Sequence, residues 1–401
     1  MHPAAWIGVA IVLLAVAAVG LLIRRRNAHL WLPGYIADRS RRRRRAAARA
    51  RAGTVDVMFA FVDHFEPVVK PGQDPARKAG AVAAWTRDWP PLAARHRDSD
   101  GRPPRMTWTF PLETYDPGIV DALVELSRQD LGEVEVHLHH DGDSSETFRA
   151  KMLDGLAKFA RHGVATVDGV EGYRFAFVHG DWALDNARPD GRYCGVNDEL
   201  TILRELGCFA DLTYPSAPSE TQPRKSNAIY YATDDPARPK SHDGGIDVEV
   251  GRAASGDLML IQGPLRPDGS SRKLGIIPRI DNAAITGVNP GTPGRINGWI
   301  ELGTGVVGRP EWVFIKVHCH SANVDDRDAV LGAAADAMFT HLERTCRTGR
   351  RRLHYVTARE MYNIIKAAEQ GRTGDPTEFR DLVIPPYKCT SLPPSGHIVS
   401  K

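Results

Sequence analysis

Apolar residues divide the chain from residue 54 onwards into alternating strands and helices. Short apolar runs predict strands, and apolar positions spaced by three and four residues predict the helices between them. We expect strands at 55–62, 105–110, 133 to about 139, 173–178, 209–213, 312–317 and 353–356. Helices are expected at about 79–97, from 116 onwards, from 143 to 163, and at 197–206, 326–346 and 358–370.

A strand followed by a helix, repeated about seven times, predicts an α/β fold. We expect a distorted barrel of about seven parallel strands over residues 54–372. Residues 214–310 break this pattern with loops rich in Gly, Pro and Asp, and they are expected to form an insertion or a wall of the substrate site. Short strands are predicted there at 246–250, 258–262 and 296–302, and the tail, 373–401, is expected to be irregular.

The N-terminal region predicts a membrane anchor. Residues 1–23 contain about twenty uncharged positions in succession, which is enough for one transmembrane helix. The following basic segment, 24–53, holds most of the arginines that precede the folded part, and we expect a juxtamembrane helix that contacts anionic lipids. The positive-inside rule then favours a single-pass protein with a cytoplasmic domain, with an extracytoplasmic domain as the alternative.

The charge and cysteine content exclude two further classes of protein. Residues 1–52 carry about +10, so the rest of the chain is mildly acidic, which argues against nucleic-acid binding. The five cysteines form no CxxC pair and are odd in number. We expect reduced, mostly buried cysteines and no disulfide framework. The sequence predicts no oligomeric state.

Histidine and aspartate recur where the predicted strands end. The pairs that follow four of these strands are Asp63 and His64, His139 and Asp143, His179 and Asp181, and His318 and His320. Carboxyl ends of parallel strands are where α/β enzymes place their chemistry. Imidazole and carboxylate ligands suit a divalent metal, best Zn²⁺, which makes bound water a nucleophile near neutral pH. Hydrolysis also needs a base for that water and an acid for the leaving group.

The chain resembles the polysaccharide deacetylases of the NodB-homology family. Their first motif, an apolar strand ending in two aspartates, is similar to Phe61-Val62-Asp63-His64. Their second motif, two histidines four residues apart, has its spacing in His139 and Asp143. Their late strand ending in a catalytic histidine looks like residues 314–318. The family's Arg-Pro-Pro-Tyr motif is replaced by residues 178–182, and its fourth motif has no equivalent.

This resemblance implies the role of each residue. Asp63 would be the base and His318 the acid, with His64, His139 and Asp143 as the metal ligands. The exchange of Asp and His between the two motifs leaves a set of two histidines and one aspartate. The substrate would be a carbohydrate, contacted by the remaining polar and aromatic residues at the strand ends, namely His179, Asp181, Trp182 and His320.

The sequence therefore favours a membrane-anchored, metal-dependent hydrolase that removes acetyl groups from an amino sugar or polysaccharide during envelope or exopolysaccharide assembly. A glycoside hydrolase using paired carboxylates such as Glu66, Glu113 or Asp181 is one alternative. A non-catalytic barrel that binds polysaccharide or serves as a scaffold is another. Structural roles also remain open, because Asp143 could be only a helix N-cap and His137 only a residue that supports the ligands.

Overall fold

Strands form at all seven places where the apolar pattern predicted them. The computed structural model describes residues 3–67, 75–273, 277–347 and 349–391. The seven strands are β1 Val55–His64, β2 Met106–Pro111, β3 Gly132–Leu138, β4 Phe175–His179, β5 Cys208–Asp211, β12 Trp312–Cys319 and β13 Arg351–Tyr355. The helices between and after them are α4 Pro75–Ala93, α5 Pro117–Arg128, α6 Ser145–Ala160, α7 Glu199–Glu205, α9 Arg327–Leu331, α10 Ala333–Arg347, α11 Ala358–Glu369 and α12 Lys388–Ser391.

These strands belong to one mixed sheet rather than to a barrel of seven. The sheet has eleven strands in the order β11-β12-β1-β2-β3-β4-β5-β8-β6-β7, with β13 paired to the first half of β1. It is mostly parallel, but β6 Ile229–Ala232 runs antiparallel to both of its neighbours, β7 Ile246–Asp247 and β8 Leu258–Ile261. The prediction of a barrel of about seven parallel strands is therefore wrong, because strands of the segment 214–310 extend the sheet at both of its ends.

A buried lysine joins parts of the sheet that no strand pairing joins. Lys316 lies on β12 near one end of the sheet, and its ammonium donates hydrogen bonds to the carbonyl oxygens of Leu212 and Tyr214, just after β5. Burial lowers the pKa of Lys316 to about 7, against the opposing effect of the Asp211 charge. Side-chain hydrogen bonds therefore hold β12 near β5, where no ladder is described between the two strands.

The insertion at 214–310 is more ordered than its composition predicted. Besides β6, β7 and β8 it contains β9 Arg266–Lys273 paired with β10 Ile277–Asp281, and β11 Ala284–Ile285 at the sheet edge. The strand predicted at 296–302 is wrong, because α8 Pro293–Leu302 occupies these residues. Pro293 suits the first turn of a helix, and Ile296, Trp299 and Ile300 have the spacing of one buried helical face.

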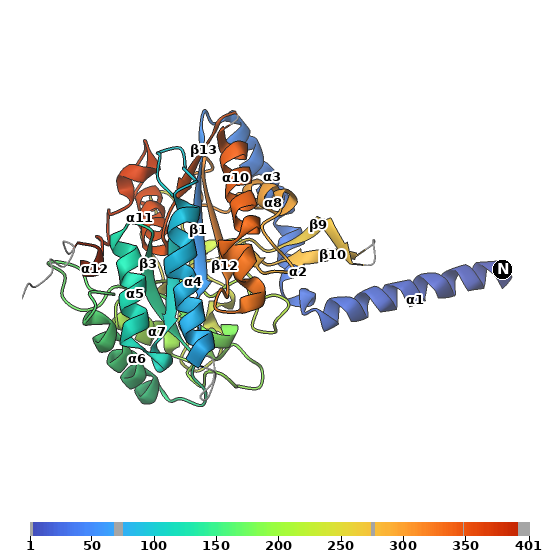
Figure 1. Ribbon diagram of the computed structural model, residues 1–401. Coiled ribbons are helices and arrows are strands. Elements are labelled where there is room, and N and C mark those ends of the chain that lie inside the picture. The colour runs from blue at the N-terminus through green and yellow to red at the C-terminus, as the bar shows by residue number, and fades with distance from the viewer. Residues whose placement is uncertain (1–2, 68–74, 274–276, 348, 392–401) are drawn as a thin grey trace, which may run out of the picture.

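The predicted membrane anchor at 1–23 is not supported. Residues 3–25 form helix α1 (Pro3–Arg25), which projects from the body in Figure 1, while residues 1–2 lie outside the described residues. Across the described residues, no helix has both the length and the apolar character for a bilayer crossing. A crossing needs about twenty apolar residues in succession. The prediction of a transmembrane helix is therefore wrong. The single-pass location and the orientation taken from the arginines depended on it and are withdrawn as well.

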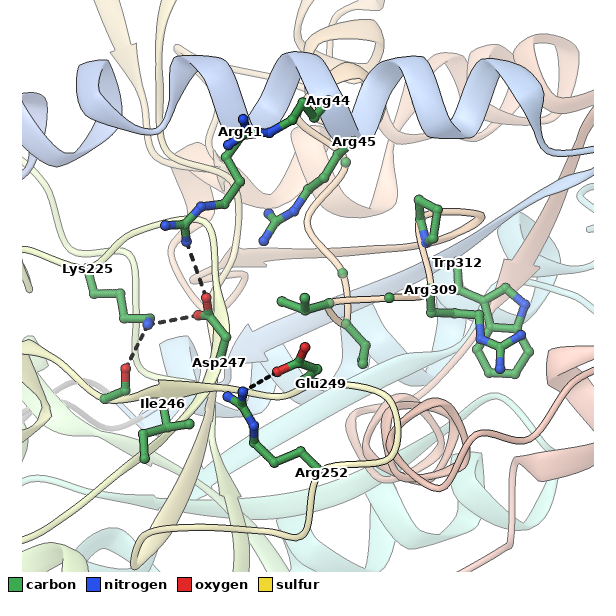
Figure 2. A pocket seen from close by; sticks show the side chains of 17 residues that line it. Arg41, Arg44, Arg45, Lys225, Ile246, Asp247, Glu249, Arg252, Arg309 and Trp312 are labelled. Carbon is green, nitrogen blue, oxygen red and sulfur yellow. Dashed lines mark hydrogen bonds and ion pairs between the residues drawn. The ribbon is translucent and has the colours of Figure 1, made fainter.

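The basic segment 24–53 packs on the body as two helices, α2 Ala28–Ala37 and α3 Arg39–Arg51. In α2, Trp31 is buried against residues of the insertion. Figure 2 shows arginines of α3 facing a pocket whose opposite side carries acidic residues, and Arg41 forms an ion pair with Asp247 at 3.4 Å. Arg49 donates to the carbonyl oxygen of Glu301 at 2.8 Å. Arg41 and Arg49 therefore bind groups of the body, although the side chain of Arg41 stays 59% exposed.

The two faces of the sheet differ in polarity. Val134, Val136 and Leu138 of β3 are buried in the main core together with residues of α5, and α4, α5 and α10 run beside one another in front of the strands in Figure 1. The alternate residues of β3 are the polar Glu133, Glu135 and His137, so they point to the other face. We call this second face the inner face. Helix α11 lies against it, since Arg359 binds Glu133 at 2.8 Å.

We predict that Lys316→Met destabilises the fold. The variant removes the ammonium donor from the buried carbonyl oxygens of Leu212 and Tyr214, of which Tyr214 keeps the backbone amide of Gly263. We expect a loss of roughly 1–3 kcal/mol in the free energy of unfolding. Urea denaturation followed by circular dichroism measures it. The control is Lys158→Met, which removes a surface ion pair with Asp154 and should change the free energy by less than about 0.5 kcal/mol. Equal effects of the two substitutions would contradict the assigned role of Lys316.

Candidate metal centre

Four histidine side chains meet on the inner face where β1, β3 and β12 end. The parallel register pairs Val62 with His318, so His64, two residues further along β1, lies near His320. The ring centre of His64 is 4.7 Å from that of His320, 5.5 Å from that of His318 and 5.4 Å from that of His137. Three strands far apart in sequence therefore contribute imidazoles to one cluster.

Glu66 lies among these imidazoles. Its Oε1 is 3.1 Å from Nε2 of His137, 3.8 Å from Nε2 of His139 and 3.9 Å from Nε2 of His320. Burial works against ionisation of Glu66, but the hydrogen bond from His137 and the nearby imidazoles outweigh it and lower its pKa to about 2. The cluster therefore has an ionised carboxylate where several ring nitrogens converge.

The ring orientations of His137 and His139 match those of metal-binding histidines. Nδ1 of His137 lies 2.7 Å from the carbonyl oxygen of Val178, which can only accept a hydrogen bond. Nδ1 of His139 lies 2.7 Å from a carboxylate oxygen of Glu113. Hydrogen bonds of this kind fix the ring and leave Nε2 for a metal. In both residues it is Nε2 that faces Glu66.

His64 offers the cluster a buried ring nitrogen that is free to bind a ligand. Its Nε2 is buried, and no described residue forms a hydrogen bond with it. Burial first, and the neighbouring histidines and Lys316 next, lower the pKa of His64 well below its usual value, so the ring is neutral. Possible ligand atoms of His64, Glu66 and His320 lie within 4.8 Å of one another, as do those of Glu66, His137 and His139. Nitrogen and oxygen donors in these numbers fit a divalent ion such as Zn²⁺.

Asp63 does not join the cluster. Its carboxylate accepts hydrogen bonds from the backbone amide of Ser321 at 2.9 Å, from the Ser321 hydroxyl and from the Cys319 thiol at 3.2 Å. Ser321 Oγ in turn accepts from the indole of Trp85, which lies on α4. Because successive side chains of a strand point to opposite faces, Asp63 lies behind the sheet and His64 in front of it. Burial raises the pKa of Asp63 to about 6 although its hydrogen bonds oppose this.

Asp143 also lies away from the four histidines. One of its carboxylate oxygens is 3.0 Å from Nδ1 of His140 and 2.7 Å from the ammonium of Lys151. The other accepts from the hydroxyl of Thr147 at 2.7 Å. The N-cap of α6 is Ser144, so Asp143 is not the cap of that helix. Of the three ligands that the resemblance implied, the structure brings together His64 and His139 and leaves Asp143 outside.

Some of the residues predicted to contact substrate lie at the histidine cluster, and one lies elsewhere. His320 belongs to the cluster, and the ring of half-buried Trp182 lies 6.1 Å from it. Asp181 is exposed beside them and has a left-handed backbone conformation, with φ of 52°. His179 is buried elsewhere, with its Nε2 2.9 Å from Nε2 of His140. Only His320, Trp182 and Asp181 therefore surround one place.

The predicted acid, His318, lies in the cluster. Two further members, Glu66 and His137, were harder to identify from the sequence. Burial, together with the charges of Lys316, His320 and Arg295, holds the pKa of His318 well below its usual value. Glu66 follows β1 by two residues, a position that strand periodicity does not describe. His137 shares the face of His139, and this alternation was the signal for it. The cysteine prediction is confirmed, since all five are free and buried.

Comparison with known proteins gives little further guidance. No protein-family model and no curated protein matches the chain. One similar solved structure is a "putative glycoside hydrolase/deacetylase" from Parabacteroides distasonis. That protein is 12% identical, the match covers 78% of this chain and 71% of the other, and the TM-score is 0.39. A likeness this weak carries no argument, so the site depends on its own geometry.

We predict that Asp63→Asn weakens the fold without removing a metal ligand. The substitution disturbs the hydrogen bonds that hold Ser321 and Cys319, and we expect a loss of roughly 1–3 kcal/mol in the free energy of unfolding. Bound metal, measured by elemental analysis of the folded variant, should equal that of the unaltered protein. A variant of unchanged stability that has lost its metal would show that Asp63 is a ligand after all.

Proposed function

We propose that this protein is a metal-dependent hydrolase that removes acetyl groups from a carbohydrate. The observation that carries the proposal is the unpartnered, buried Nε2 of His64 beside the carboxylate of Glu66 and the imidazole of His320. The residues that would hold the ion are His64, Glu66, His137, His139 and His320. When bound, Zn²⁺ would supply a nucleophilic water near neutral pH.

The remaining side chains of the cluster can position the substrate and move protons. His318 is the donor to the leaving group in this proposal, as the resemblance to the deacetylases implies, and it would first have to take up a proton, because burial lowers its pKa. Asp63 faces the other side of the sheet, so another carboxylate must take the proton of the water. Glu113 is our candidate, because it reaches the cluster through His139 and its side chain is about one third exposed, at 31%.

The carbohydrate part of the proposal is supported by Trp182. Its half-buried ring beside His320 offers a flat apolar face at the edge of the cluster, next to the exposed carboxylate of Asp181. A sugar ring also has an apolar face and a polar edge. Trp182 therefore suits the part of the substrate that flanks the acetyl group.

A glycoside hydrolase fits this geometry less well. That chemistry needs one carboxyl group that stays protonated, with a raised pKa. Glu66 has instead a pKa of about 2, and Glu113 is hydrogen bonded to His139. The carboxylates of the cluster are held by imidazoles, which is what a metal site requires.

We predict that Glu66→Gln removes metal and activity together. The amide keeps the size of the side chain but loses the negative charge, and altering a group that only supports a ligand already costs 10–100-fold in metal affinity or activity. We expect acetate release from acetylated oligosaccharides to fall by about 100-fold or more. Elemental analysis should show a parallel loss of bound metal. Glu125→Gln, at an exposed carboxylate of α5, is the matched control and should change neither quantity.

Glu113→Gln separates the proposed base from the ligands. This variant also loses the carboxylate that orients His139, so metal affinity should fall by about 10–100-fold, and acetate release measured at saturating metal should fall further. Tyr115→Phe, two residues further on, should leave both unchanged. Full activity of the unaltered protein after metal removal with a chelator would refute the metal-dependent mechanism.

A further inference from the structure

A second group of metal-type side chains lies behind the first, fully enclosed by protein. It consists of His140, His179, Cys194 and Glu199, all of them buried. They come from four segments: the end of β4, the first turn of α7, the loop after β3 and the loop before α7. None of the four has a role in the proposed hydrolysis.

One possible ligand atom from each of the four residues lies within 4.8 Å of the others, which is close enough for a single ion. Oε1 of Glu199 lies 3.3 Å from Nε2 of His140 and 3.4 Å from Nε2 of His179. Cys194 Sγ lies 3.6 Å from the other oxygen of the same carboxylate. Two nitrogen or oxygen ligands about 2.1 Å from a tetrahedral Zn²⁺ are about 3.4 Å apart, and a sulfur at about 2.3 Å is slightly further from them. Only the pair of imidazole nitrogens, at 2.9 Å, is closer than this.

The hydrogen bonds of the two imidazoles leave both Nε2 atoms for a common partner. Nδ1 of His179 lies 2.6 Å from the carbonyl oxygen of Gly180, which can only accept, so Nδ1 carries the hydrogen. Nδ1 of His140 lies 3.0 Å from the carboxylate of Asp143 and is also the donor. In the neutral rings, Nε2 then has a lone pair and no hydrogen. Two lone pairs 2.9 Å apart repel each other unless a cation or a proton lies between them.

Two backbone amides point at the sulfur of Cys194, while burial and the charge of Glu199 raise the pKa of its thiol, so that only a bound cation would favour the thiolate. The sulfur accepts hydrogen bonds from the backbone amides of Asn186 at 3.3 Å and Val196 at 3.4 Å. Hydrogen bonds of this kind stabilise ligand sulfur. One thiolate, one carboxylate and two neutral imidazoles around a divalent ion have no net charge. Neutrality matters here because an uncompensated charge in a fully buried site is costly.

We propose that His140, His179, Cys194 and Glu199 bind a structural zinc ion. All four positions are filled by protein, as in closed structural sites, and Asp143 orients His140 from outside. The ion would fasten the loops next to the hydrolytic cluster. His139 and Trp182 lie on these loops, and a Cβ on Gly180 would come within 2.3 Å of the His139 ring.

Cobalt substitution of the full-length protein tests the proposal independently of hydrolysis. Co²⁺ bound by Cys194 gives a near-ultraviolet thiolate-to-cobalt charge-transfer band, whereas the first cluster contains no cysteine ligand. We expect this band in the unaltered protein and in Glu66→Gln, and its loss in Cys194→Ser. The matched control is Cys319→Ser, because Cys319 is also buried and contacts a carboxylate, that of Asp63. This control should retain the band.

A milder variant keeps the test decisive if Cys194→Ser fails to fold. Asp143→Asn keeps the size of the side chain but weakens its support of His140, together with its contacts to Lys151 and Thr147. It should weaken zinc binding by about 10–100-fold, measured by competition with a chromophoric chelator. Arg149→Gln, on the exposed side of α6, should leave binding unchanged. The proposal is overturned if folded, cobalt-loaded protein lacks the sulfur band, which would leave the four residues as a buried hydrogen-bond network. If the unaltered protein shows the band but releases no acetate from acetylated oligosaccharides, only the proposed function is refuted.

Discussion

The parallel pairing of β1 with β12 determines which side chains can form the proposed metal centre. In this register Val62 is opposite His318 and Asp63 is opposite Cys319. Parallel strands that end at the same edge bring their last residues together, and the pleat then sorts these residues by face. His64, His318 and His320 go to the inner face, whereas Asp63 and Cys319 go to the outer one. A shift of one residue would exchange the two sets.

This sorting explains how much of the site the sequence could predict. Apolar runs located the seven parallel strands, and polar residues at their ends located the chemistry. The face of each residue was harder to predict. Asp63 and His64 are adjacent, so only one of them can face the histidines of β3, and the motif resemblance placed both at the metal. Alternation along β1 would have separated them. It could not have supplied Glu66, because the chain has left the strand by then.

Contacts between loops that are distant in sequence were even harder to predict. Cys194 was assigned to the core because a single cysteine without a CxxC partner has no spacing to interpret. Its ligand-type neighbours are separated from it by loops, and only the folded chain brings them together. The full width of the sheet could not be predicted from local sequence either. Strands β6, β7 and β8 are short segments in a Gly- and Pro-rich region, and their pairing depends on tertiary contacts more than on local pattern.

Buried polar groups on the inner face give the histidine cluster rigid support. Below His137 on β3, Glu135 accepts from the hydroxyl of Tyr387, and Glu133 binds Arg359. Breaking a buried ion pair by removing one partner costs about 3–5 kcal/mol, so these contacts resist rearrangement. They also make residues 376–391 part of the folded body, although their sequence predicted an irregular tail. Because these contacts fix β3, they hold His137 and His139 in one orientation.

The dipeptide His139–His140 links the two groups of ligands. β3 ends at Leu138, and beyond it the two adjacent rings turn in different directions. His139 faces Glu66, and His140 faces His179 and Glu199. Any movement that draws His140 out of its buried site must shift the backbone that carries His139. Preorganisation of a catalytic metal centre depends on support of this kind from outside the ligand shell. A closed site directly behind an open one would therefore fix the geometry of the hydrolytic histidines without taking part in the reaction.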